Sequence, residues 1–138
     1  MRQKGFATLE VILMVMVIGI LASIAVPRFN AVTAAANTAK IQADLSTLDS
    51  TAAIYFMREG KNPTTLSDVA DYVRGASGEL KPPSGKCYIK GTLSDVPSGD
   101  YSFTSDSTTG ECQACLGTDK HTAADFYVEK SGKGDGEG

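Results

Sequence analysis

The chain has 138 residues, a formal net charge of −3 and a sequence pI of about 5.1. Once an N-terminal apolar segment is set aside, this length leaves room for one modest domain. The acidic balance provides no general basic field, so nucleic acid is not expected as a partner.

The first predicted element is an apolar run from Phe6 to Val26, in which Glu10 is the only charged side chain. Helical residues rise about 1.5 Å each, so the run covers roughly 31 Å and matches the hydrocarbon core of a bilayer. A carboxylate costs about 2.5–3.5 kcal/mol at the centre of a bilayer, and less near its edge. Either Glu10 reaches the headgroups from its shallow position, or it has a compensating partner.

Three interpretations of this N-terminal segment are open: a spanning helix in which Glu10 has a partner, a cleaved signal peptide, and a permanent single-pass anchor. Arg2 and Lys4 precede the run and keep the N-terminus cytoplasmic by the positive-inside rule, although Arg28 works against that rule. A signal peptide is an alternative, because Ser23 and Ala25 are spaced for cleavage after Ala25, which would release a secreted binding domain. A permanent single-pass anchor is the third interpretation. Neither a signal peptide nor an anchor gains from a carboxylate inside the span.

The residues Lys4-Gly5-Phe6, then Glu10, and then an apolar run that ends at Pro27 form a recognisable pattern. It resembles the N-terminus of the type IV pilin family, which includes type IV pilins, type II secretion pseudopilins and competence pilins. The resemblance implies that a prepilin peptidase cleaves after Gly5 and methylates the new N-terminal Phe6. The membrane holds such a protein before assembly.

In that family the glutamate of an incoming subunit pairs with the N-terminal amine of a neighbour, and here these groups are Glu10 and the amine of Phe6. A charge pair is far stronger at low dielectric than in water, so this pair would set the register between subunits. The resemblance further implies a homo-oligomeric helical filament, built with an inner-membrane assembly platform and minor pilins. The filament would be extracellular, or a periplasmic pseudopilus.

Beyond Pro27, apolar residues recur at spacings of four and three and predict a continued amphipathic helix. The helix is expected to end near Glu59, with Gly60 just after its last turn. Pro27 predicts a kink and Gly19 a second weak point, and the resemblance suggests that the stretch between them loses helicity in assembled filaments. The members of the apolar stripe are Ile41, Leu45, Leu48, Ala52 and Tyr55.

The rest of the chain predicts a small head with a short helix, opened by a capping box at Thr65 and ending near Arg74. Alternating residues in the later strands predict an antiparallel meander with one face on the long helix. A tail without apolar residues follows, in which Asp135 and Glu137 are expected to be solvated rather than to hold calcium. The predicted strands are Cys87–Leu93, Tyr101–Thr104, Cys112–Leu116 and Phe126–Glu129.

The three cysteines favour an oxidising, extracytoplasmic location, because they permit one disulfide and leave one thiol. Cys87 could pair with Cys112 or with Cys115, which would stabilise the head by about 2–4 kcal/mol. We favour Cys87–Cys112, with Cys115 as a buried thiol. A zinc site formed by the three cysteines and His121 is the alternative, and an oxidising compartment argues against it.

His121 is the only histidine, and the chain has no nucleophile elbow or metalloprotease motif. No enzyme activity and no cofactor are therefore expected. The sequence predicts an α+β chain whose function is that of a structural subunit of a type IV pilus, with a pseudopilus or a competence filament as alternatives. Its segments are a leader (1–5), a transmembrane assembly helix (6–27), an amphipathic continuation (28–60), an α/β head (61–130) and a flexible tail (131–138).

Overall fold

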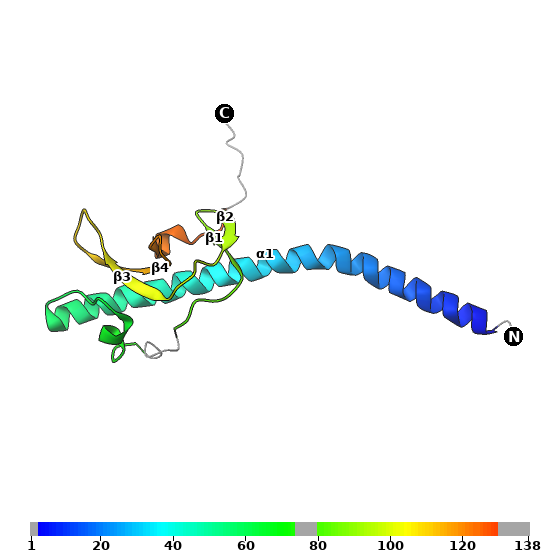
Figure 1. The fold of residues 1–138 in the computed structure, drawn as a ribbon, viewed down its shortest axis with the longest axis horizontal. Helices are drawn as coiled ribbons and strands as arrows, with labels where there is room; N and C mark the ends of the chain where they lie inside the picture. The colour runs from blue at the N-terminus through cyan, green and yellow to red at the C-terminus, as the bar shows by residue number, and fades with distance from the viewer. Residues whose placement is uncertain (1–2, 74–79, 130–138) are drawn as a thin grey trace, which may run out of the picture. The chain divides into compact units, whose positions relative to one another are not determined.

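The computed structural model describes residues 3–73 and 80–129 (Figure 1). The chain divides into two compact units, Met1–Thr33 and Ala34–Gly138, and each is considered by itself below. One α-helix, α1 (Gln3–Glu59), contributes residues to both units. The predicted boundary between the head (61–130) and the tail (131–138) lies outside the described residues, as does the tail. The short helix predicted to run to about Arg74 is wrong in length, because its helical part ends at Val69.

In the first unit the described residues are entirely α-helical, and the helix continues through both Gly19 and Pro27. The kink at Pro27 stays a prediction. The loss of helicity between these two residues concerns the assembled filament and also stays a prediction. A Cβ added at Gly19 would meet no atom within 4 Å, so packing within the chain does not require a glycine there.

In the second unit α1 buries one stripe of apolar side chains, as its spacing predicts. Ile41, Leu45 and Leu48 have no exposed surface, and Tyr55 is also buried. The helix ends at Glu59, and the N–H of Gly60 donates to the carbonyl oxygen of Phe56 at 2.8 Å. Gly60 has a φ of +70°, the left-handed conformation in which glycine ends a helix without a Cβ penalty. The predicted end of the helix is therefore confirmed.

Two small antiparallel sheets form the rest of this unit. The first pairs β1 (Lys86–Ile89) with β2 (Thr92–Asp95), and the second has the order β3–β4–β5. Figure 1 shows β3 and β4 beside the C-terminal part of α1, where Tyr101, Ala114 and Leu116 pack into one core with the helix stripe. The bounds of the second sheet are β3 (Tyr101–Ser105), β4 (Cys112–Leu116) and β5 (His121–Thr122).

Two predicted strands need correction. The stretch Cys87–Leu93 is a hairpin rather than one strand, because Lys90 (φ 50°) and Gly91 (φ 77°) form a tight turn within it. Both residues are left-handed, which is the geometry of a two-residue hairpin turn. The stretch Phe126–Glu129 is not a strand. Phe126 instead follows a 3₁₀ turn, η2 (Ala123–Asp125), and its side chain is fully buried in the core.

The short helix of the head is a single 3₁₀ turn, η1 (Leu66–Val69), with Thr65 at its N-cap. The Asp68 carboxylate accepts hydrogen bonds from the backbone N–H groups of Thr64 (2.9 Å) and Thr65 (3.0 Å). These donors stabilise the ionised carboxylate and lower the pKa of Asp68 to about 2. The predicted capping position is therefore correct, although the element is shorter than an α-helix.

Candidate functional site

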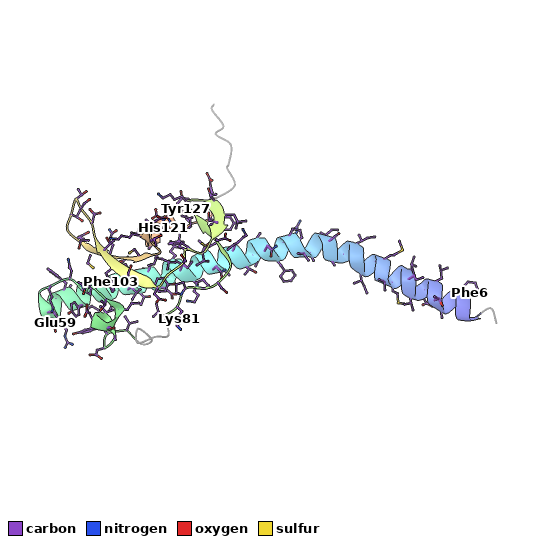
Figure 2. All side chains as sticks on the ribbon, in the orientation of Figure 1. Phe6, Glu59, Lys81, Phe103, His121 and Tyr127 are labelled. Atoms are coloured by element: carbon purple, nitrogen blue, oxygen red, sulfur yellow. The ribbon has the colours of Figure 1, made fainter. Side chains whose placement is uncertain are left out.

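The surface of the first unit is apolar on every side of the helix. Each large apolar side chain from Phe6 to Val32 is at least half exposed, and Phe6 reaches 74%. Figure 2 shows these side chains projecting around the first part of α1, with Phe6 near its start. The helix is long and apolar enough to cross a membrane by length and composition. Such a surface needs a covering outside the chain, either lipid or other helices.

Glu10 lies on this apolar surface and is exposed. None of the ion pairs among the described residues involves it. Phe6 and Glu10 are four residues apart, so they lie on the same face of the helix. The structure thus places a single carboxylate next to the residue that would become the N-terminus.

Polar side chains of α1 attach the helix to the first sheet. The hydroxyl of Thr38 is buried and accepts a hydrogen bond from the backbone N–H of Tyr88 at 2.7 Å. The side-chain amide of Asn37 donates to the carbonyl oxygens of Lys86 (2.9 Å) and Ser84 (3.2 Å). These contacts fix β1 and the chain before it on the helix.

Two carboxylates of α1 attach it to the second sheet. Asp44 accepts hydrogen bonds from the Tyr101 hydroxyl at 2.7 Å and from the Lys40 ammonium at 2.6 Å. Burial, and then the hydrogen bond to Asp44, raise the pKa of Tyr101. Asp49 accepts the backbone N–H of Ala114 at 2.6 Å, and burial raises its pKa while this hydrogen bond acts against the rise.

The sequence did not predict the contacts that four residues of α1 make with the head. These residues are Asn37, Thr38, Asp44 and Asp49. A signal was present, because Thr38, Asp44 and Asp49 flank the apolar stripe on the helix face that packs against the head. Their partners are 50 to 65 residues away in the chain, so the spacing of polar residues did not identify them.

The structure holds all three cysteines as free thiols. The preferred Cys87–Cys112 disulfide is absent, because the helix holds the two cysteines apart. Tyr88, next to Cys87, bonds to Thr38, whereas Ala114, near Cys112, bonds to Asp49. Eleven helical residues separate these anchors and correspond to roughly 16 Å. A disulfide needs Cα atoms within about 7 Å.

The four residues of the alternative zinc site are not brought together either. Cys112 and Cys115 are three residues apart on β4 and therefore point to opposite faces of the sheet. Cys115 is fully buried, and its sulfur lies 3.2 Å from the Ser102 hydroxyl. The Nδ1 atom of His121 lies 3.5 Å from a carboxylate oxygen of Asp125. No cluster of three or more potential ligands occurs among the described residues.

The long apolar helix and the small antiparallel head together form a type IV pilin-like α+β fold. Comparison with curated proteins gives relatives of two kinds. The chain is 29% identical over 113 residues to the type II secretion system core protein G of Klebsiella pneumoniae, covering 80% of each chain. It is 28% identical over 114 residues to the protein of that name from Klebsiella michiganensis, covering 79% of this chain and 78% of the relative.

A third relative is the type IV narrow pilus major component PilA5 of Thermus thermophilus. It is 41% identical over 64 residues, which are 46% of this chain and 55% of that protein. No profile of a protein family matches the chain, and no solved structure matches it. The named homologues confirm the resemblance to the type IV pilin family that the N-terminal residues indicated.

Proposed function

We propose that this chain is a structural subunit of a pilus or pseudopilus filament, and that it polymerises through the first part of α1. The observation that carries the proposal is the helix surface between Phe6 and Val32, which is apolar on all sides and exposed. The names of the relatives support it, since one is a core protein of a secretion system and another a major pilus component. The function is mechanical, and no enzyme activity is proposed.

Processing after Gly5 is the first step of the proposed mechanism. Cleavage by a prepilin peptidase removes Arg2 and Lys4 and leaves a methylated, positively charged amine on Phe6. Before assembly the apolar helix spans the membrane once, with its N-terminus cytoplasmic. The assembly platform and minor pilins then receive the subunit, and the filament forms outside the cell or in the periplasm.

Glu10 has the role of aligning each subunit with its neighbour. In a bundle of apolar helices an unpaired carboxylate is costly, and the amine of a neighbouring Phe6 provides the opposite charge. A subunit shifted along the bundle would leave both charges unpaired. The pair therefore favours one axial register over all others.

A pseudopilus is the second candidate within this function. The two relatives that match about 80% of the chain are type II secretion proteins, whereas the pilus component matches less than half of it. The longer matches favour a type II secretion filament.

The first experiment is to measure the intact mass and the N-terminal residue of the protein from membranes and from sheared surface material. A methylated Phe6 is expected. A chain that begins at Val26 would mean cleavage by signal peptidase after Ala25, and the proposal would then be rejected.

The second experiment tests the charge pair. We expect Glu10→Ala and Glu10→Gln to abolish filaments in electron micrographs while the protein remains in the membrane fraction. Glu59→Gln is the matched control, because Glu59 is an exposed carboxylate at the other end of the same helix. Normal filaments from both Glu10 variants would contradict pairing with Phe6.

A further inference from the structure

A groove of about 570 Å³ lies at the C-terminal end of α1, and we call it the distal groove. Its apolar wall on the helix includes Phe56, which is half exposed, and Met57, which is 81% exposed. Its carboxylates are Asp49 and Glu111, and no lysine or arginine is among the described residues that line it. Asp49 already accepts a backbone N–H of β4, whereas Glu111 is exposed and belongs to no ion pair among the described residues. The groove therefore combines exposed apolar side chains with a negative charge that the described head leaves unpaired.

Most of the basic side chains described in the head are engaged within the chain. Arg58 packs over a tyrosine ring, and the Lys120 ammonium contacts a threonine hydroxyl. The described lysines that remain are Lys61, which stands next to Asn62 of the distal groove, and Lys81. Lys81 is exposed and is therefore a basic residue away from the groove whose charge has no carboxylate partner in the described part of the chain. The lysines that are paired with an aspartate are Lys40, Lys86 and Lys90.

Lys81 begins a short segment of basic and apolar residues, Lys81-Pro82-Pro83, whose prolines are partly exposed. Its carbonyl oxygen accepts a hydrogen bond from the Lys40 ammonium at 3.1 Å, which holds the segment beside that part of α1 (Figure 2). Proline fixes its own φ and favours an extended conformation of the residue before it. Such a segment loses little entropy when it binds, and proline-rich segments dock into grooves lined by aromatic side chains for this reason.

The segment and the distal groove are different surfaces of one head. Sixteen residues of α1 separate Lys40 from Phe56, which corresponds to roughly 24 Å along the helix. A contact between the two surfaces therefore joins two copies of the chain rather than two parts of one copy. Contacts between two different surfaces repeat in one direction and build open filaments instead of closed dimers.

We propose that the distal groove of one copy receives Lys81-Pro82-Pro83 of the next copy in the filament. The Lys81 ammonium lies beside the Glu111 carboxylate, and the prolines contact Phe56 and Met57. The proposal rests on the proposed function, because it needs copies that the first part of α1 holds together, and it adds a contact between their heads.

A second copy is a better occupant than a different protein for two reasons. The unpaired charges of the two surfaces have opposite sign, so they favour one arrangement of neighbouring heads. In a filament each groove also has the same segment of neighbouring copies close by, at a high effective concentration.

The test uses filaments sheared from cells that produce the full chain, treated with a water-soluble carbodiimide. This reagent joins an ammonium and a carboxylate in contact by an amide bond. We expect a ladder of dimers and higher oligomers on denaturing gels, with the Lys81–Glu111 link identified in them by mass spectrometry. Lys81→Arg keeps the charge but cannot form the amide, so it should abolish this link and leave the filaments intact. Lys86→Arg is the matched control and should keep the link, because Lys86 is paired with Asp95 of its own chain.

Charge reversal measures whether the contact supports assembly. Lys81→Glu and Glu111→Lys should each lower the amount of sheared filament about fivefold, as expected when an exposed ion pair becomes repulsive. The double variant should restore the natural amount. Lys86→Glu combined with Glu111→Lys is the control and should restore nothing.

The outcomes separate this contact from the proposed function. Intact filaments without the Lys81–Glu111 link, or a double variant that restores nothing, would reject the contact and leave the proposed function standing. A link found only within monomers, or only to a different protein, would also reject the contact between copies. If the natural chain forms no filaments at all, the proposed function is rejected and this contact with it.

Discussion

The two parts of α1 differ in where their apolar surface goes. In the first part apolar residues occur on all sides and all remain exposed, whereas in the second part they form one stripe that the head covers. Both parts are regular α-helix. The two parts therefore differ in how apolar side chains are distributed around the helix. The second part buries its apolar stripe against the head, whereas the first part needs lipid or other helices to cover it.

The two parts of α1 also differ in their polar contacts. The second part carries Thr38, Asp44 and Asp49, each of which satisfies a group of the head. The first part has only Glu10 as a charged residue between Phe6 and Val26. Under the proposed assembly, one charged residue is enough to align the first part with neighbouring helices, whereas the second part holds the head through several fixed hydrogen bonds.

The largest expected effect comes from replacing one leucine by alanine in each part of α1 and comparing the two variants. Leu45→Ala should lower the free energy of unfolding of the head by about 2–5 kcal/mol, because Leu45 is fully buried. Leu13→Ala is the matched control, since Leu13 is 63% exposed, and it should leave head stability unchanged. Urea unfolding of the full chain in detergent micelles, followed by tyrosine near-UV circular dichroism, measures both. Equal losses would show that the head also depends on the first part.

The sequence predicted the features that local spacing determines. The stripe from Ile41 to Tyr55, the end of the helix before Gly60 and the strand Cys112–Leu116 are all confirmed. In each of them the residue types agree with the element over several consecutive positions, so the local pattern is sufficient.

The sequence did not predict features that depend on distant partners or on one unusual turn. The turn at Lys90-Gly91 was missed because lysine is uncommon at positive φ, and the apolar residues on both sides read as one strand. Phe126 was assigned to a strand because its alternation with Val128 resembles one, although burial in the core decides its position. The contacts of Asp44 and Asp49 depend on residues more than 50 positions away.

A smaller effect is expected from Asp44, whose contact with the head has no counterpart among the described residues of the first part. Asp44→Ala would leave the Tyr101 hydroxyl without its acceptor, and the Tyr101 side chain is almost completely buried. A buried unsatisfied group costs about 1–3 kcal/mol. The same urea experiment should show this loss, and Asp44→Asn should lose less because its amide oxygen can still accept. If Asp44→Ala costs as much in a Tyr101→Phe background, the hydroxyl is not the cause.

The smallest expected effect is a pH dependence at Asp49. Burial raises the pKa of Asp49 in the folded head above its ordinary value of 3.8, so the folded state keeps this proton to higher pH than the unfolded state does. The contribution of Asp49 to the free energy of unfolding therefore falls as the pH rises from 3.8 through the raised pKa. Asp49→Asn does not titrate, and its amide oxygen can still accept the Ala114 N–H.

The stability of Asp49→Asn relative to the natural chain should consequently increase between pH 3 and pH 7 in urea titrations. Asp49 and Glu111 line one pocket at the C-terminal end of α1, so Glu111→Gln should be combined with both proteins to keep the nearby charge constant. A difference that does not change with pH would mean that the Ala114 hydrogen bond fully offsets the burial of the carboxylate. In that case the hydrogen bond between Asp49 and Ala114 stabilises the head to the same extent across the pH range, and the attachment of β4 to α1 does not depend on pH.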